Sequence, residues 1–370
     1  MLRICTKCVM DTTDPNIFFD SEGICNHCHR YNDTLKIRTS FDKIKNFDEQ
    51  INKIKKRGLG STYDCIVGIS GGVDSSYLLQ IALKNKLRVL AVHVDNGWDS
   101  ELAVYNIRKL VETTGVDYVT HILDWKEFRD LQIAFLKGNT PDGEIPTDHA
   151  IDATLWRLAD KYGVKTILSG MNFQTEAISI PGWAYGHSDY TYIHDVYKKN
   201  MKKKLKSFPY YTLIYLWYLT YIKGIRIVSL LNYINYDKES AIKELTQEIN
   251  WRPYDGKHYE SIYTRFYLGY ILPTKFNIDL RKAHLSDLIN SRQITRREAL
   301  NELDQPPLSM DLVSKDLKYL LEKFELDKEE FDNIIKSKPM SFRDYANNYQ
   351  LVQFARSTVN FLRRFNLYPK

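Results

Sequence analysis

The apolar positions in the central part of the chain alternate between two periods, and this alternation predicts an α/β fold. Short apolar runs, typical of buried strands, occur at residues 64–69, 87–94, 116–123 and 164–168. Between them, apolar residues recur at helical spacing at residues 75–85, 100–114 and 150–162. Strands that alternate with helices imply a parallel, doubly wound sheet with helices on both faces.

The pattern outside this sheet divides the chain into further regions. The N-terminal stretch is rich in turn formers, and the stretch after it carries apolar residues, among them Phe41, Ile51 and Ile54, at helical spacing. We expect one amphipathic linker helix there, ending at Gly58. The expected domains are a zinc ribbon at residues 1–32, the linker helix at 33–60, the α/β domain at 61–195 and a mostly helical C-terminal region at 196–370.

A glycine-rich loop, Ser70-Gly71-Gly72-Val73-Asp74-Ser75-Ser76, joins the first predicted strand to the first predicted helix. Glycine lets the backbone approach a ligand, and N–H groups at a helix start bind anions. No Gly-Lys-Ser/Thr follows, so this is not the lysine-bearing nucleotide loop. The string resembles the pyrophosphate loop (PP-loop) of the N-type ATP pyrophosphatases, with their adenine nucleotide alpha hydrolase-like fold. We therefore expect it to bind ATP and hold the pyrophosphate.

Polar clusters follow two further strands, where ligands bind in parallel α/β sheets. We expect the cluster with His93, Val94 and Asp95 to line the adenine, and Gly170 and Asn172 to join the nucleotide site. Carboxylates beside phosphates are the ligands that Mg²⁺ prefers. Asp74 and Glu176 are the expected magnesium ligands.

Because the loop lacks a lysine, another part of the chain must neutralise the departing pyrophosphate. Lys257, Lys275, Arg281 and Lys282 in the C-terminal third are candidates, and a solvated surface charge is the alternative for each. We expect Asp74, Lys257, Lys275 and Arg281 to be the catalytic residues. The C-terminal region would then complete the active site.

Cys5, Cys8, Cys25 and Cys28 form two Cys-x-x-Cys pairs, a strong zinc signature. Four thiolates leave no open position on the ion, so we expect a structural Zn²⁺. His27 and His29 are close enough to be alternative ligands, and we interpret both as solvated loop residues. The fifth cysteine, Cys65, lies in the first strand.

Composition adds few constraints on function. The net charge of +6 fits a protein that handles polyanionic small molecules and gives no argument for nucleic acid. The chain start lacks a signal peptide and the cysteines indicate a reducing compartment, so we expect a cytoplasmic protein. A basic run at residues 198–206 leads into an aromatic, apolar run at 208–222. We expect a buried helix or a subunit contact there, with a peripheral membrane contact as the alternative.

No Cys, His and Glu set for glutamine hydrolysis stands out in the sequence. We therefore expect that this chain does not release ammonia from glutamine itself, and that ammonia for its reaction comes from elsewhere.

The chain resembles the N-acetyl sugar amidotransferases of bacterial surface-polysaccharide and lipopolysaccharide (O-antigen) biosynthesis. The resemblance rests on the ribbon directly before the loop, on Val94–Gly97, on Gly170–Glu176, and on strings at 256–261, 275–286 and 293–296. The chain departs from the family pattern at Arg292, where a glycine is expected, and we interpret this as a variation at a helix junction.

The resemblance implies a specific reaction. The acetamido oxygen of an N-acetylated sugar, carried on a sugar nucleotide or a nonulosonic acid, would be adenylated by ATP with release of diphosphate. Ammonia would then displace AMP to leave an acetamidino group. The resemblance also implies two partners, a glutaminase subunit similar to the histidine-pathway glutaminase and a barrel subunit similar to its cyclase.

Other functions remain open. Zinc ribbons also accompany pyrophosphate loops in tRNA-modifying ligases and thiolases, although a thiolase usually needs cysteines in its catalytic domain and only Cys65 is available. A non-catalytic zinc-ribbon protein that keeps ATP as a scaffold is a third class.

Overall fold

Five strands form one sheet at the centre of the molecule, in the order β3-β2-β1-β4-β5, and all neighbouring strands are parallel. The computed structural model describes residues 3–39, 43–180 and 182–364. The strands are β1 (Cys65–Gly68), β2 (Val89–Asp95), β3 (Asp117–Ile122), β4 (Thr166–Leu168) and β5 (Arg226–Val228). The predicted parallel α/β sheet is confirmed, and β5 is an edge strand that the apolar pattern did not predict.

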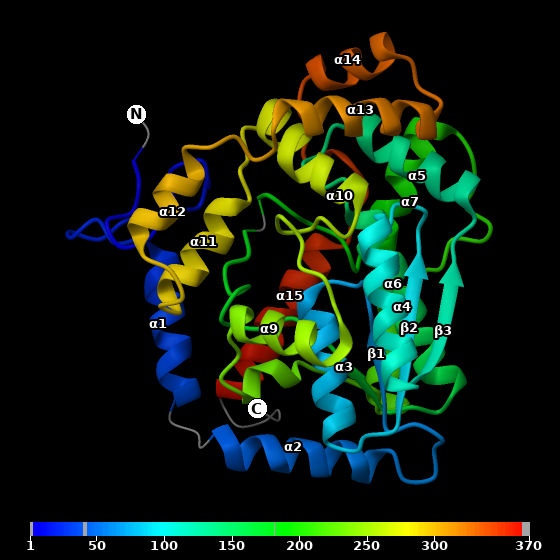
Figure 1. The fold of residues 1–370 in the computed structure, drawn as a ribbon. Helices are drawn as coiled ribbons and strands as arrows, with labels where there is room; N and C mark the ends of the chain where they lie inside the picture. Colours follow the sequence, from blue (N-terminus) through cyan, green and yellow to red (C-terminus); the bar gives the residue numbers. More distant parts are fainter. Residues whose placement is uncertain (1–2, 40–42, 181, 365–370) are drawn as a thin grey trace.

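Fifteen α-helices surround the sheet within the described residues (Figure 1). They are α1 (Asn26–Thr39), α2 (Lys43–Arg57), α3 (Val73–Lys84), α4 (Glu101–Thr114), α5 (Trp125–Lys137), α6 (Ile145–Lys161), α7 (Tyr190–Met201), α8 (Leu213–Trp217), α9 (Lys238–Ile249), α10 (Ile262–Phe266), α11 (Arg281–Asn290), α12 (Arg296–Leu303), α13 (Met310–Phe324), α14 (Lys328–Lys336) and α15 (Tyr349–Arg364). Two of them continue as π-helix, α8 through Tyr218–Ile222 and α10 through Tyr267–Phe276.

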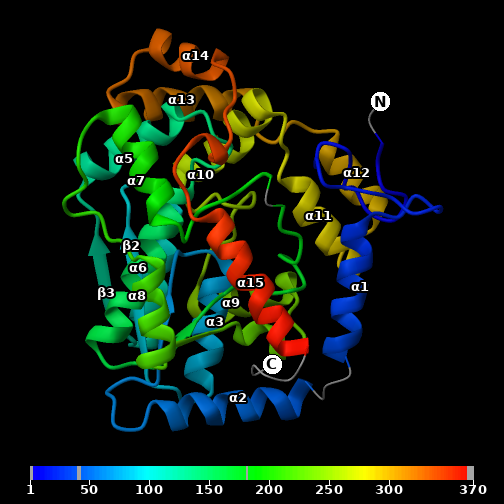
Figure 2. The same cartoon turned by 180° about the vertical axis from the view of Figure 1, so that it is seen from behind.

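The two faces of the sheet are covered by different helices because side chains alternate along each strand. Val67 of β1 and Ala91 of β2 pack in one cluster with residues of α3, α4, α9 and α2. Ile66 and Val92 pack in another cluster with residues of α6. Figure 2 shows α6 and α8 over this second face. The sheet is thus doubly wound, as predicted.

The strand order places a topological switch at β1. The chain moves from β1 outward to β2 and β3, then returns to build β4 on the other side of β1. The connections after β1 and β4 therefore diverge to opposite faces and leave a crevice between them. The glycine-rich loop and the Ser169–Glu176 cluster follow these two strands and meet at this crevice.

The C-terminal region packs on the helices beside the sheet. One apolar cluster joins Phe135 of α5 and Tyr192 of α7 to Phe266 of α10, Phe324 of α13 and Phe331 of α14. All five side chains are buried. The predicted mostly helical C-terminal region is confirmed, and it forms one core with the α/β domain.

The single linker helix predicted over residues 33–60 is wrong. Two helices occupy this stretch, α1 and α2, and they run in different directions (Figure 1). Ile51 and Ile54 are buried as predicted, because α2 packs them into the apolar cluster that also contains residues of α3. Phe41 lies outside the described residues. The ribbon leads directly into α1, which starts at Asn26.

The aromatic run at residues 208–222 is not the buried helix that was one expectation. Only part of it is buried, including Phe208 and Leu219, whereas Ile214, Trp217 and Tyr221 are 80%, 54% and 51% exposed. These three side chains recur at helical spacing, so α8 and its continuation present an apolar face to the outside. A contact with another subunit or a membrane surface stays a prediction. Within the described residues, no helix is long and apolar enough to cross a membrane.

Candidate active site

The loop after β1 presents backbone N–H groups at the start of α3. Gly71 has φ +78°, and a Cβ atom there would lie 2.8 Å from the carbonyl oxygen of Ala103, so the position requires glycine. Gly72 is the N-cap and offers no side chain to the first N–H groups of the helix. The loop therefore leaves the positive end of α3 open to an anion.

Hydrogen bonds within the loop and from one distant segment of the chain hold the loop in this shape. The N–H of Ser70 donates to Oγ of Ser75 at 3.2 Å. The carbonyl oxygen of Gly71 accepts from Nε1 of Trp251 and from the hydroxyl of Tyr254, each at 3.0 Å. The segment after α9 thus fixes the conformation of a loop about 180 residues earlier.

A cavity of about 900 Å³ lies in front of the loop. Its walls come from the loops after β1 and β4, the start of α9, the segment 251–260, and α10 to α12. This volume is typical of a small-molecule site. The predicted residues on its wall are Ser70, Gly72, Val73, Asp74, Ser75, Gly170, Glu176, Lys257 and Arg281.

The cluster of His93, Val94 and Asp95 at the end of β2 does not line the cavity. His93 is buried, with Nδ1 3.0 Å from the carbonyl oxygen of Ile69 and Nε2 2.8 Å from Oδ2 of Asp99. Val94 is buried as well, and Asp95 accepts a hydrogen bond from the N–H of Gly97. The reason lies in the topology, because β2 is on the side of β1 away from β4. The expectation that these side chains line an adenine therefore finds no support in the cavity.

Four other predicted residues also stay off the cavity wall. Gly71 and Ser76 shape the loop and the first turn of α3, and the Asn172 side chain holds the turn after β4 through two bonds to Thr175, at 2.9 and 3.0 Å. The ammonium of Lys275 contacts Asn139 and the carbonyl oxygen of Ile334, and it donates to Oγ of Ser337 at 3.0 Å. Burial lowers the pKa of Lys275 to about 8. Lys275 thus ties α14 to the loop after α5.

Asp74 and Glu176 are two of the carboxylates on the cavity wall. Oδ1 of Asp74 accepts a hydrogen bond of 2.5 Å from the hydroxyl of Tyr236. Burial raises the pKa of Asp74, the bond from Tyr236 opposes the increase, and Glu176 adds to it. A pair of carboxylates next to an anion-binding loop is a donor set that fits Mg²⁺.

Lys257 is the predicted cation that reaches these carboxylates. Its Nζ lies 3.5 Å from Oε1 of Glu176 and 3.2 Å from Nδ1 of His284. Burial and the nearby Lys257 lower the pKa of His284 to about 2, so the imidazole is neutral. Lys238, at the start of α9, is a second lysine on the wall, and its charge lowers the pKa of Asp74.

The two arginines of the cavity are already paired. Arg281 donates to both carboxylate oxygens of Asp279, at 3.1 and 2.7 Å, and to the carbonyl oxygen of Glu302. Arg265 forms two bonds of 2.7 Å to Asp316. These guanidinium groups shape the wall that α10 to α12 form, and the two lysines supply the positive charge near the loop.

Several residues of the site were not predicted from the sequence. Tyr236, Lys238, Trp251, Tyr254 and Asp287 come from segments without a motif of their own. Asp287 on α11 is 1% exposed, and burial raises its pKa to about 7. The sequence feature that could have pointed to this part of the site is the density of aromatic and basic residues just before Gly256.

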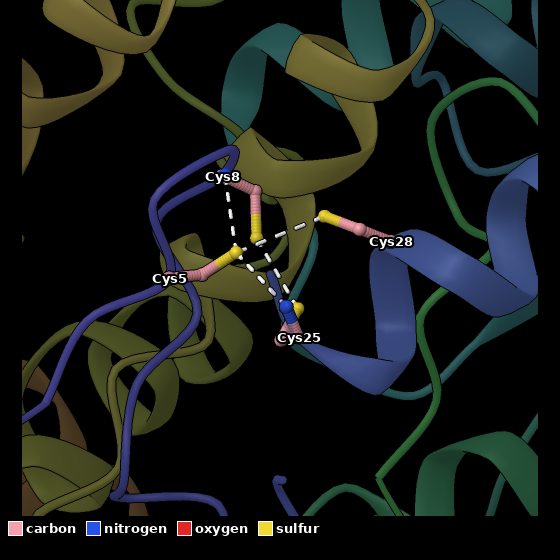
Figure 3. Close-up of side chains that lie close together, drawn as sticks. All are labelled: Cys5, Cys8, Cys25 and Cys28. Carbon is pink, nitrogen blue, oxygen red and sulfur yellow. Dashed lines mark hydrogen bonds between the residues drawn. The ribbon is translucent and has the colours of Figure 1, made fainter. Parts of the chain in front are cut away.

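The four ribbon cysteines converge on one point (Figure 3). Cys5 and Cys8 come from a loop, and Cys25 and Cys28 from the start of α1. Their sulfur atoms all lie within 4.8 Å of one another, and all four side chains are fully buried. The N–H of Cys25 also donates to Sγ of Cys5 at 3.2 Å. Four buried thiols in such a cluster fit a closed, tetrahedral zinc site.

His27 is not the solvated residue that was expected. It is 5% exposed, and its Nε2 lies 2.6 Å from Oδ2 of Asp14, so its ring is part of the ribbon core. His29 is exposed, as expected, and lies 2.8 Å from Asp20.

The ribbon is attached to the wall of the cavity. Arg296 on α12 donates to the carbonyl oxygens of Cys5 and Cys8, both at 2.9 Å. Lys282 on α11 pairs with Asp11 at 2.6 Å. Because α11 also carries Arg281, His284 and Asp287 on the cavity wall, the ribbon fixes the position of this wall.

A family comparison matches the C-terminal part of the chain. Residues 260–357 match the family model described as "LPS biosynthesis protein WbpG-like, C-terminal domain". The match covers α10 to α14 and most of α15, and it includes the part of the cavity wall that α10 to α12 form. Comparison with curated proteins gives no match.

Several solved structures resemble the chain at low similarity. NMN synthetase from Francisella tularensis matches with 12% identity and a TM-score of 0.31, over 57% of this chain and 94% of that one. NH3-dependent NAD synthetase from Campylobacter jejuni subsp. jejuni, in complex with the nitrate ion, matches with 12% identity and a TM-score of 0.35, over 81% and 99%. A predicted subunit of tRNA methyltransferase from Methanocaldococcus jannaschii matches with 15% identity and a TM-score of 0.29, over 49% and 75%.

Proposed function

We propose that this protein is an ATP-dependent amidotransferase that forms AMP and diphosphate and converts an acetamido group of a sugar into an acetamidino group. The product would serve lipopolysaccharide or another surface polysaccharide. The observation that carries the proposal is the single cavity that joins an anion-binding helix start, two carboxylates and two lysines to the α10–α12 wall. That wall lies in the part of the chain that matches the LPS-biosynthesis family.

The loop would bind the β- and γ-phosphates of ATP through the N–H groups at the start of α3. Lys257 and Lys238 would stabilise the negative charge that grows on the departing diphosphate. Asp74 and Glu176 would hold Mg²⁺, which neutralises phosphate oxygens when bound. The acceptor sugar would occupy the side of the cavity formed by α10 to α12, with its amide oxygen directed at the α-phosphorus.

Nucleophilic sulfur chemistry has no support in the cavity. Among the described residues on its wall there is no cysteine, and Cys65 is fully buried in β1, where burial raises its pKa. The thiolase alternative therefore lacks a sulfur carrier. The nitrogen would come as ammonia, and we propose the glutaminase and cyclase-like partners as its source.

The test is incubation of the purified protein with ATP, Mg²⁺, ammonium and a panel of N-acetylated sugar nucleotides and nonulosonic acids. We expect AMP release that depends on one sugar, and a mass decrease of that sugar by the difference between oxygen and NH. A parallel reaction replaces the sugars with tRNA. AMP release with tRNA alone would contradict the proposal and favour a tRNA-modifying ligase.

A further inference from the structure

A second, much smaller hollow lies next to the main cavity. It has a volume of about 40 Å³ and lies between α1 and the segment 173–178, with Tyr31, Thr34 and Phe173 among its walls. A water-sized molecule needs about 10–15 Å³ of such volume. The hollow can therefore admit ammonia, whereas a sugar or a nucleotide does not fit.

One residue lines both spaces. Ile178 lines both the small hollow and the main cavity. Its N–H donates to Oδ2 of Asp287 at 2.9 Å, and Asp287 lines the main cavity. Asp287 therefore lies directly behind the wall that the hollow reaches from the other side.

Buried acceptor atoms without a partner lie on both sides of this wall. Oδ1 of Asp287 has no hydrogen-bond partner among the described residues, although its side chain is almost fully buried. On the side of the hollow, Nδ1 of His27 also lacks a partner, while Nε2 is bound to Asp14. A buried acceptor without a partner is costly and indicates a donor that binds there. Ammonia has three N–H bonds and can donate a hydrogen bond first to Nδ1 of His27 and then to Oδ1 of Asp287.

We infer that ammonia enters through the hollow between α1 and the segment 173–178, passes Ile178, and is received by Asp287 in the main cavity. The inference rests on the proposed function, because it names the entry of the proposed nucleophile. Arg30 also lines the hollow, and its positive charge favours neutral ammonia over ammonium. A partner that delivers ammonia would then dock over α1 and the ribbon.

Ammonia then displaces AMP beside Asp287. The nitrogen of ammonia attacks the imidate carbon of the adenylated acceptor, a C–N bond forms, and the C–O bond to AMP breaks. AMP leaves with the electron pair of that bond. The carboxylate of Asp287 accepts the proton that the new amidine nitrogen loses.

The experiment separates adenylation from ammonia transfer. Acceptor-dependent exchange of labelled diphosphate into ATP, without ammonia, reports adenylation, and amidine formation at varied ammonium reports transfer. Thr34→Trp should fill the hollow from α1 and raise the KM for ammonium about tenfold or more, with exchange unchanged. Thr34→Ser is the matched control and should behave like the natural protein. Asp287→Asn should lower the rate of amidine formation at least tenfold and leave exchange intact.

The outcomes distinguish this inference from the proposed function. An unchanged KM for ammonium in Thr34→Trp, or loss of exchange in Asp287→Asn, would overturn the entry route while the proposed function stands. If the natural protein shows no acceptor-dependent exchange, the proposed function fails and the inference fails with it.

Discussion

Asp74 is the carboxylate of the anion-binding loop itself, and it lies on the cavity wall. Its pKa is raised by burial, so the ionised form that Tyr236 stabilises is costly at this buried position. Asp74→Asn keeps the shape and removes the charge. We expect AMP formation to fall at least about 100-fold while the protein still folds.

The measurement is AMP release by chromatography, with circular dichroism as the folding check. Asp48→Asn, an exposed residue of α2, is the matched control and should retain full activity. An active Asp74→Asn variant would contradict the magnesium role of this residue.

Lys257 and Lys275 look alike in the sequence but have different surroundings. Lys257→Met should lower AMP formation about 100-fold and change stability little, because its ammonium lies beside Glu176 on the cavity wall. Lys275→Met should keep AMP formation and lower the free energy of unfolding by about 1–3 kcal/mol, because three oxygen atoms lose the charged donor that Lys275 provides. Urea unfolding and the AMP assay on both variants check this. The opposite pattern would show that Lys275 is the catalytic cation.

Glu144 makes stability depend on pH. Burial and nearby Asp148 raise the pKa of Glu144 from 4.5 to about 8. Between these values the folded protein keeps a proton that the unfolded chain releases, so the contribution of Glu144 to stability is fully present below about pH 4.5 and is lost as the pH rises toward 8. We expect Glu144→Gln to flatten this decline in urea unfolding between pH 5 and pH 8.5. An unchanged slope would show that Glu144 is ionised in the fold.

At the scale of elements, the ribbon and the α11–α12 pair behave as one unit. Arg296 holds two carbonyl oxygens of the cysteine loop, and removal of a charged donor from such bonds costs about 1.5–3 kcal/mol. We expect Arg296→Met to lower the free energy of unfolding by that amount. Metal analysis should still find one zinc per chain, because the four thiols are untouched.

Arg297→Met is the control for that variant, since Arg297 is the next residue on α12 and is exposed. It should change stability by less than about 0.5 kcal/mol. Equal effects of the two substitutions would show that the hydrogen bonds from Arg296 to the ribbon do not stabilise the protein.

At the scale of the whole molecule, the apolar face of α8 is exposed, and the fold of a single chain does not explain why its side chains are apolar. Substituting Ile214 and Trp217 together by serine should change stability little, because both side chains are exposed. We expect the same variant to weaken association with a second copy of this chain, measured by sedimentation velocity. A parallel assay with anionic lipid vesicles tests the membrane alternative.

Ile122→Ser is the control, because Ile122 on β3 is also an exposed apolar side chain, at 70%. If the double variant sediments and binds vesicles like the natural protein, the apolar face has no role in either contact.

The sequence alone determined what depends on neighbouring residues. The alternation of strand and helix, the glycine-rich loop and the paired cysteines were all predicted, because each is specified by residues close together in the chain. The glycine expected at Arg292 also reflects a local constraint, since Arg292 has φ +62°, where glycine is favoured. The structure confirms that this position joins two helices, α11 and α12.

Only the tertiary structure decided which distant side chains share the cavity. Lys257 and Lys275 are separated by a short segment, yet the π-helical stretch between them carries the second lysine to α14. The strand order put His93 on the strand that lies away from β4, whereas the packing of α9 and α11 brought Lys238 and Asp287 to the cavity wall. Such choices depend on how the C-terminal region folds back over the sheet, and the physical reason is that long-range packing, rather than local propensity, sets which faces meet.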